Sequence, residues 1–188
     1  MYQHSEDLGW IIKIVTRHTW RSADKLSLII RSTLQTLFPF LSVNRRDMRA
    51  YNKLNECLKA FIPEYRTTLL KTSKGTGLVT RKIMDDDATM SSNLSTYLQN
   101  HQHLTDELEE SFRQFFDLLI RNNIYFYDFN HDNFLIQKKD GHELLWFIDL
   151  KGYRKDKSFL RLTYLSAKQA EIKMTRRIGQ FYDRLNRY

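Results

Sequence analysis

The sequence is poor in cysteine, proline and glycine, with one, two and six of these residues among 188. The single cysteine, Cys57, excludes an internal disulfide and any zinc site with several cysteines, a pattern typical of a reducing compartment. Its helical spacing among apolar neighbours predicts a buried core side chain. No apolar run approaches the ~20 residues that a bilayer span requires, and the N-terminus lacks the basic-then-apolar layout of a signal peptide. We expect a folded cytoplasmic protein.

Acidic residues are also outnumbered, by 30 Lys and Arg to 22 Asp and Glu, which gives a net charge of +8. Residues 151–188 contain eleven basic and three acidic residues and hold the whole surplus. Such a surface favours the phosphates of nucleotides, nucleic acids or anionic lipids. A solvated helical face explains the same pattern equally well. Nucleic-acid binding rests on charge alone, so nucleic acid is the partner class that the sequence favours least.

Hydrophobic periodicity predicts a mixed α+β chain. Residues 10–15, WIIKIV, form a β-branched apolar run interrupted by Lys13, which predicts a strand with one placed cation. Helical spacing of apolar residues predicts helices over residues 22–38 and 44–61. Residues 66–83 predict a hairpin, in which the two glycines of the segment SKGTG supply the turn.

The second half of the chain begins at a polar break, MDDDATMSS, over residues 84–92. Its three consecutive aspartates are better explained as a solvated hinge than as a cation site. Helices are predicted over residues 93–99 and from Thr105, where acidic residues suit the positive end of the helix dipole. Residues 144–150, LLWFIDL, predict an apolar strand that ends in Asp149, and basic helices follow.

Between that helix and that strand lies the most specific segment, YFYDFNHDNFLIQ, over residues 125–137. It places five polar side chains within six positions of an aromatic run: Asp128, Asn130, His131, Asp132 and Asn133. An Asx-turn, in which these side chains bond nearby amides, explains such a cluster without function. For His131 and Asp132 a role in stabilising the turn is favoured over substrate contact.

The order of charged groups along the chain matches the requirements of phosphoryl transfer from ATP. Lys13 would neutralise phosphate charge, and Asp47 on the second predicted helix would hold its ammonium. Asp128 would accept or orient the proton of the acceptor hydroxyl. Asn133, five residues later, and Asp149 would hold Mg²⁺ through oxygen atoms, which a hard cation prefers. Several parts in the right order favour this interpretation over an isolated turn.

These segments resemble the PhoP-regulatory-network (YrbL) family of bacterial proteins, whose fold is similar to that of protein, aminoglycoside and lipopolysaccharide-core kinases. The resemblance covers most of residues 2–150, through the segments IIKIV, RRDMRAYNKL, GTGLVTRKI, DFNHDNFLI and FIDLKG. It implies an α+β, protein-kinase-like fold of two lobes with nucleotide in the cleft. The expected lobes are a reduced N-terminal sheet lobe, residues 1–84, and a helical C-terminal lobe, residues 85–188.

Compared with the kinase pattern, Asp128 and Asn133 match the catalytic loop. Asp149 matches the metal aspartate, although the glycine that follows it comes one residue late, at Gly152. Asp47 replaces the usual glutamate partner of the lysine. The resemblance therefore implies ATP and Mg²⁺ as cofactors, with Asp128 and Lys13 catalytic, and with Lys13, Asp47, Asn133 and Asp149 at the nucleotide.

The leading hypothesis is an ATP- and Mg-dependent phosphotransferase that acts on a hydroxyl of a small molecule or glycan, an envelope saccharide being one candidate. An anionic membrane surface is a further candidate partner, which would make the protein peripheral to the inner membrane. The alternative is a pseudokinase-like nucleotide-binding or regulatory module. It is motivated by the twelve residues before Lys13, which contain a single glycine, Gly9, where a kinase has a glycine-rich loop.

Overall fold

The computed structural model describes residues 2–3, 9–14, 43–73, 75–126, 129–150, 154–155 and 167–187. The helix predicted over residues 22–38 lies outside these ranges. The chain is mixed α+β, with small antiparallel sheets and several helices. It divides into two compact units, one of Met1–Lys53 with Glu64–Lys82, and one of Leu54–Pro63 with Ile83–Tyr188.

The first unit contains the strands β1 (Tyr2–Gln3), β2 (Trp10–Ile14), β3 (Leu70–Thr72) and β4 (Gly75–Arg81). They form one antiparallel sheet in the order β1-β2-β4-β3. In the register of this sheet Lys13 on β2 lies opposite Leu78 on β4. The strand predicted around Lys13 and the hairpin of β3 and β4 are confirmed.

The role predicted for the glycines of this hairpin was wrong. Gly75 and Gly77 do not form the turn but lie within β4, where Gly77 is paired with Ile14. A Cβ atom added at Gly77 would overlap Cγ2 of Ile12, whose side chain is buried on β2. Gly77 is therefore required for the close approach of the two strands.

The single helix predicted over residues 44–61 is two helices, α2 (Val43–Lys53) and α3 (Glu56–Lys59). The break is caused by Asn55, whose backbone is extended and whose side chain accepts a hydrogen bond from the N–H of Leu58. Asn55 is thus an N-cap that starts a new helix. The prediction for Cys57 was also wrong, because this residue is exposed on α3 while its neighbour Leu58 fills the core.

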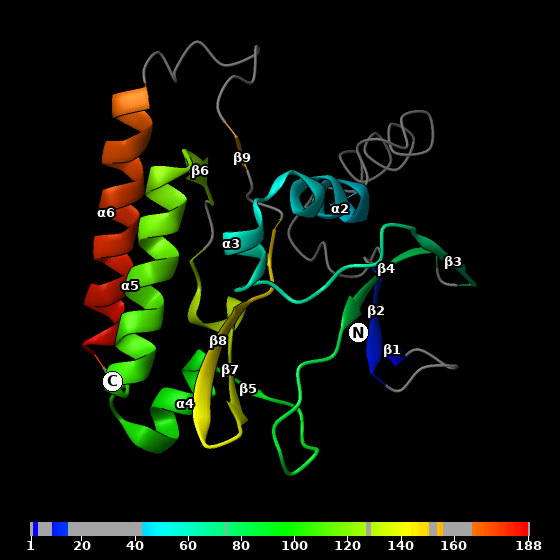
Figure 1. The fold of residues 1–188 in the computed structure, drawn as a ribbon, viewed down its shortest axis with the longest axis horizontal. Helices are drawn as coiled ribbons and strands as arrows, with labels where there is room; N and C mark the ends of the chain where they lie inside the picture. The colour runs from blue at the N-terminus through cyan, green and yellow to red at the C-terminus, as the bar shows by residue number, and fades with distance from the viewer. Residues whose placement is uncertain are drawn as a thin grey trace, which may run out of the picture. The chain divides into compact units, whose positions relative to one another are not determined.

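The second unit contains the helices α4 (Leu94–His101), α5 (Asp106–Arg121) and α6 (Ala167–Leu185). Both α4 and α5 begin where the sequence predicted, since Asn93 and Thr105 accept hydrogen bonds from the first-turn N–H groups of Thr96 and Leu108. Figure 1 shows α5 and α6 side by side and antiparallel. Phe112 and Phe116 of α5 contact Phe181 of α6, with ring centroids 5.2 and 5.3 Å apart.

The same unit contains a three-stranded antiparallel sheet of β5 (Ser92–Asn93), β7 (Phe134–Lys139) and β8 (His142–Phe147), in that order. A two-stranded sheet pairs β6 (Ile124–Tyr125) with β9 (Arg154–Lys155). A short 3₁₀ helix, η3 (His131–Asn133), precedes β7. The strand predicted over residues 144–150 is confirmed as β8, which ends before Asp149.

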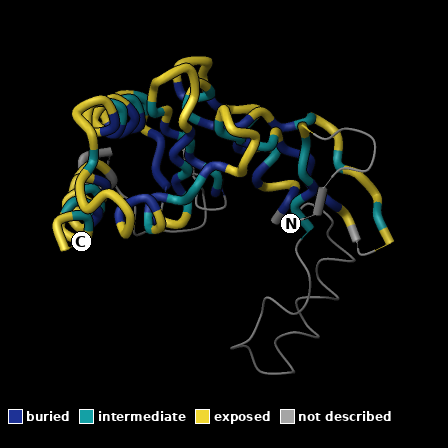
Figure 2. The backbone as a smooth tube through the Cα atoms, turned by 90° about the horizontal axis from the view of Figure 1, so that it is seen from below, coloured by how far each residue is buried: buried dark blue, intermediate teal, exposed yellow. Residues whose placement is uncertain are grey.

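An aromatic core fills the space between α5, α6 and the β7–β8 hairpin. The ring centroid of Phe134 lies 5.0 Å from that of Phe147 and 5.2 Å from that of Phe112, and all three side chains are fully buried. Buried positions, dark blue in Figure 2, alternate with exposed positions, yellow, along the helices. On α6, Met174 and Phe181 are buried, whereas Ile172 is exposed.

The three aspartates of the polar break each accept hydrogen bonds from other residues of the chain. Asp85 accepts from the Ser91 hydroxyl and from the N–H of Lys138 on β7. Asp86 accepts from the N–H of Asp140 in the β7–β8 turn. Hydrogen bonds from the Thr89 hydroxyl and backbone N–H lower the pKa of Asp87. The break is therefore bonded to the hairpin of the second unit.

Candidate functional site

The first part of the candidate site is an ion pair within the first unit. Lys13 Nζ on β2 lies 3.1 Å from Oδ2 of Asp47 on α2. The Lys13 side chain is 18% exposed, whereas that of Asp47 has no exposed surface. The predicted pairing of Lys13 with Asp47 is thus present in the structure, and the shorter side chain of aspartate is accommodated by the close position of α2. The Lys13 side chain therefore keeps some access to solvent, while the side chain of its partner Asp47 is buried.

Asn44 positions the helix that holds Asp47, and the sequence analysis missed it. Its side-chain amide donates to the carbonyl of Lys13 at 3.1 Å and to the carbonyl of Thr76 at 2.7 Å. These carbonyls belong to the neighbouring strands β2 and β4, so one side chain joins the start of α2 to both. Asn44 precedes Asp47 by three residues and therefore lies on the same helical face. That spacing was the available signal.

The second part of the candidate site lies in the second unit, at one end of the β7–β8 hairpin. Asn133 comes directly before β7, and Asp149 follows β8 by two residues. The strands pair Phe134 with Phe147, and beyond this pair the carbonyl of Asn133 accepts a hydrogen bond from the N–H of Ile148 at 2.9 Å. The two predicted metal ligands are thereby brought to adjacent strands at the same end.

The environments of Asn133 and Asp149 differ. The Asp149 side chain is buried, with 8% of the residue exposed, whereas Asn133 is of intermediate exposure. Their oxygens fit Mg²⁺, which proteins commonly bind through one or two carboxylates while phosphates and water complete the octahedron. Within the described ranges, no group of three His, Cys, Asp or Glu side chains gathers as a metal site.

Asp128 is the polar residue of the predicted catalytic segment whose position is not described, whereas the polar residues that follow it are placed by the structure. Asp128 lies outside the described residues, together with Tyr127 and with Gly152. His131 is buried on η3, and its ring lies edge-on to Phe181 with centroids 4.9 Å apart. Burial is the main cause of a lowered pKa of His131. His131 thus packs against α6, whereas Asp132 is exposed.

The sequence profile of the family described as PhoP regulatory network protein YrbL matches residues 1–186. The chain belongs to this family. The match to the YrbL family covers both units, and it confirms the membership inferred from the motifs. No curated protein matches the chain at a significant level. Among the helices that the structure describes, none is both long and apolar enough to cross a membrane.

Proposed function

We propose that this YrbL-family chain is an ATP- and Mg-dependent phosphotransferase with a kinase-like fold of two lobes, residues 1–84 and 85–188. The acceptor is a hydroxyl of a small molecule or glycan, with an envelope saccharide as one candidate class. The proposed location is the cytoplasm, including the anionic surface of the inner membrane. The observation that carries the proposal is the Lys13–Asp47 pair, because a partly exposed lysine side chain held by a fully buried carboxylate is the arrangement that a phosphate-binding lysine needs.

Each residue has a defined role in this proposal. Lys13 binds the phosphates of ATP, Asp47 orients its ammonium, and Asn44 holds α2 at the required distance. Asn133 and Asp149 hold Mg²⁺, which neutralises charge on the phosphates. Asp128 takes the proton of the acceptor hydroxyl. The oxygen of that hydroxyl bonds to the terminal phosphorus of ATP, while the bond from this phosphorus to ADP breaks.

The proposal is tested by two measurements on the full chain and on Asp149→Ala. The first is thermal unfolding with and without ATP and Mg²⁺, and the second is ADP formation in the presence of candidate hydroxyl acceptors. Ligand at ~100 times its dissociation constant adds about 2.7 kcal/mol to stability, which raises the melting temperature by a few degrees. We expect a rise that requires Mg²⁺ and is lost in Asp149→Ala.

The catalytic role of Asp128 is tested by Asp128→Ala. Removal of a positioned general base lowers turnover ~10²- to 10⁴-fold while nucleotide binding is kept. The matched control is Asp117→Ala, which removes an exposed aspartate of α5 whose carboxylate lies 3.8 Å from Arg121. Full activity in Asp128→Ala would remove this residue from the mechanism, and an equal loss in Asp117→Ala would show that the assay reports folding.

A second candidate is a pseudokinase-like module that binds nucleotide or a regulatory partner without transfer. The observation that favours it is at Gly9, which lies four residues before Lys13. The carbonyl of Gly9 accepts a hydrogen bond from the N–H of Lys82 at 2.8 Å, which ties this glycine to the sheet rather than to a loop over phosphates. Nucleotide binding without ADP formation would support this candidate, whereas ADP formation that depends on Asp149 would exclude it.

A further inference from the structure

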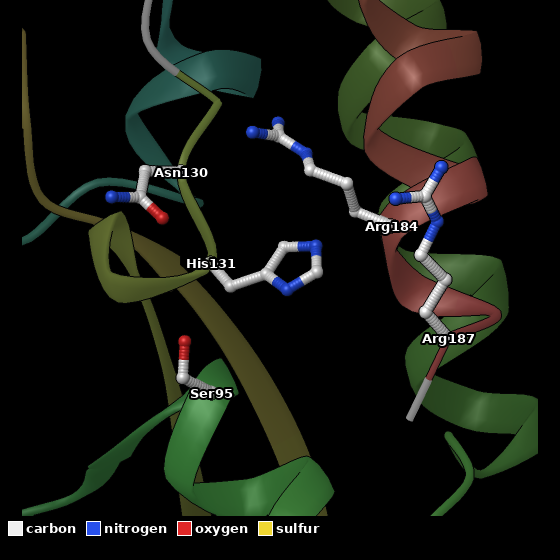
Figure 3. Close-up of a pocket in the computed structure, with 5 residues that line it drawn as sticks. All are labelled: Ser95, Asn130, His131, Arg184 and Arg187. Carbon is white, nitrogen blue, oxygen red and sulfur yellow. The ribbon is translucent and has the colours of Figure 1, made fainter.

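The second unit contains a cavity of about 320 Å³ at the C-terminal end of α6. It is lined by polar and basic side chains from three elements: Ser95, Asn130, His131, Arg184 and Arg187. Figure 3 shows the His131 ring pointing toward α6, Arg184 reaching back toward the segment that bears Asn130, and Ser95 approaching from α4. The volume is at the small end of the range for small-molecule sites.

Arg184 has a fixed position and spare donors. Its Nη2 donates to the carbonyl of Phe129 at 2.8 Å, and its Nε donates to the carbonyl of Gln180 at 3.2 Å. A guanidinium has five N–H donors, so three remain for a ligand. The two backbone bonds hold the fork in place before a ligand arrives, which reduces the entropy lost on binding.

Arg187 adds a second positive charge, one helical turn beyond Arg184. Within the described part of the chain its guanidinium has no hydrogen-bond or ion-pair partner. Asp183 lines an adjoining hollow of about 220 Å³ together with Gln180 and the two arginines, and the exposed Asp132 follows His131 in the chain. The residues that line the cavity include two arginines and no acidic side chain, so the lining is positive. Paired arginines are the side chains that bind phosphate oxygens most effectively.

The other lining residues offer neutral hydrogen-bonding groups. Ser95 lies in the first turn of α4, where the helix dipole also favours an anion. Among the residues that the structure describes, neither its hydroxyl nor the side-chain amide of Asn130 is bonded. His131 closes the cavity on the side of Phe181. Such groups recognise hydroxyls or ester oxygens rather than bare charge.

We propose that this cavity binds a small phosphate monoester whose organic part bears hydroxyl groups. Arg184 and Arg187 contact the phosphate oxygens. Ser95 and Asn130 contact the organic part, since the cavity is larger than a phosphate ion alone requires. The inference goes beyond the proposed phosphotransfer, because it requires neither nucleotide nor magnesium and uses none of the residues assigned to them.

The test is calorimetric titration of the full chain with glycerol 3-phosphate and with inorganic phosphate, in chloride buffer at constant ionic strength. We expect saturable binding of one equivalent, tighter for glycerol 3-phosphate than for inorganic phosphate. Arg187→Ala removes a guanidinium that makes no hydrogen bond or ion pair within the described chain, and we expect it to weaken binding by roughly tenfold or more. Asp149→Ala, which abolishes nucleotide binding in the proposed function, leaves this affinity unchanged.

The matched control is Arg176→Ala, which removes an equal charge from an exposed position on the same helix, outside the cavity. We expect an affinity within twofold of the parent. Equal weakening by Arg176→Ala and Arg187→Ala would reduce the effect to net charge and overturn the proposal. The absence of saturable binding up to about 10 mM ligand would also overturn the proposal, because weak specific sites have dissociation constants of about 1 mM. Arg187-dependent binding to vesicles containing phosphatidic acid, without binding of glycerol 3-phosphate, would overturn the small-molecule assignment.

Discussion

Lys13 Nζ lies 3.1 Å from Oδ2 of Asp47, a carboxylate that has no exposed surface. A buried ion pair is weak as a stabilising device, because desolvation of both charges offsets their attraction. The pair is nevertheless fixed from both sides, by the β2–β4 register and by the two hydrogen bonds of Asn44. This arrangement favours a role in binding, in which Lys13 directs its charge to a ligand.

Replacement of Lys13 by methionine separates the role of the ion pair in stability from its role in ligand binding. Lys13→Met keeps the length of the side chain but leaves the buried Asp47 carboxylate without the ammonium. Breaking a buried pair in this way costs ~3–5 kcal/mol, and we expect a loss near the lower end, since Lys13 is partly exposed. The measurement is urea denaturation.

The double variant Lys13→Met/Asp47→Asn removes the isolated charge as well. We expect it to be more stable than Lys13→Met alone, while nucleotide binding is absent from both. The comparison also needs the single variant Asp47→Asn. If the double variant lost as much free energy of unfolding as Lys13→Met and Asp47→Asn lose together, the two residues would not be coupled.

Addition of one methyl group at Gly77 tests the close approach of β2 and β4. In Gly77→Ala the new Cβ overlaps Ile12 Cγ2, so one strand must move or the Ile12 rotamer must change. Overpacking of this kind costs ~1–3 kcal/mol, which would be read from the free energy of unfolding.

Gly179 on α6 provides the matched control, because nothing lies within 4 Å of a Cβ added there. Alanine is favoured over glycine in a helix by ~1 kcal/mol, so Gly179→Ala should stabilise the chain. If both alanine variants changed stability in the same direction, the steric explanation for Gly77 would fail.

Stability at high pH depends on Tyr97. Burial, with hydrogen bonds from its hydroxyl to Glu143 at 2.9 and 3.1 Å, raises the pKa of Tyr97 to about 12 from its ordinary value of 10.0. Between these values the unfolded chain releases the proton and the folded chain retains it. The free energy of unfolding therefore falls as pH rises from 10 toward 12.

Tyr97→Phe removes this titration and should give a flatter stability profile between pH 9 and 12, measured by urea denaturation at each pH. Tyr182, whose pKa is also raised by burial, is present in both proteins and cancels in the comparison. Parallel profiles for the parent and Tyr97→Phe would show that Tyr97 does not titrate in this way.

Local patterns in the sequence predicted much of the fold. The apolar run around Lys13 and the acidic residues at the start of α5 each depend on neighbours within a few positions, which a sequence displays directly. The errors arose where a residue type has two uses. Glycine is common in turns, but Gly77 lies in a strand and allows its close contact with Ile12. Asn55 lies within a helical pattern of apolar residues, but it ends that pattern by capping a new helix.

The candidate site was predictable only in part. Lys13 and Asp47 were paired from their order along the chain, and the structure brings them together. Asn44 was missed because its acceptors are backbone carbonyls 31 and 32 positions away, which no side-chain motif encodes. The position of Arg184 was missed for the same reason, since it bonds the carbonyl of Phe129 across 55 positions.

The exposed position of Cys57 has an experimental consequence. Because the chain has no other cysteine, a maleimide dye or nitroxide reacts with a single defined atom on α3, without any background substitution. Introducing a second thiol into the exposed β3 strand would then place two probes on different units. Their separation, measured by fluorescence transfer or electron spin resonance before and after addition of nucleotide, would report directly whether the units move against each other.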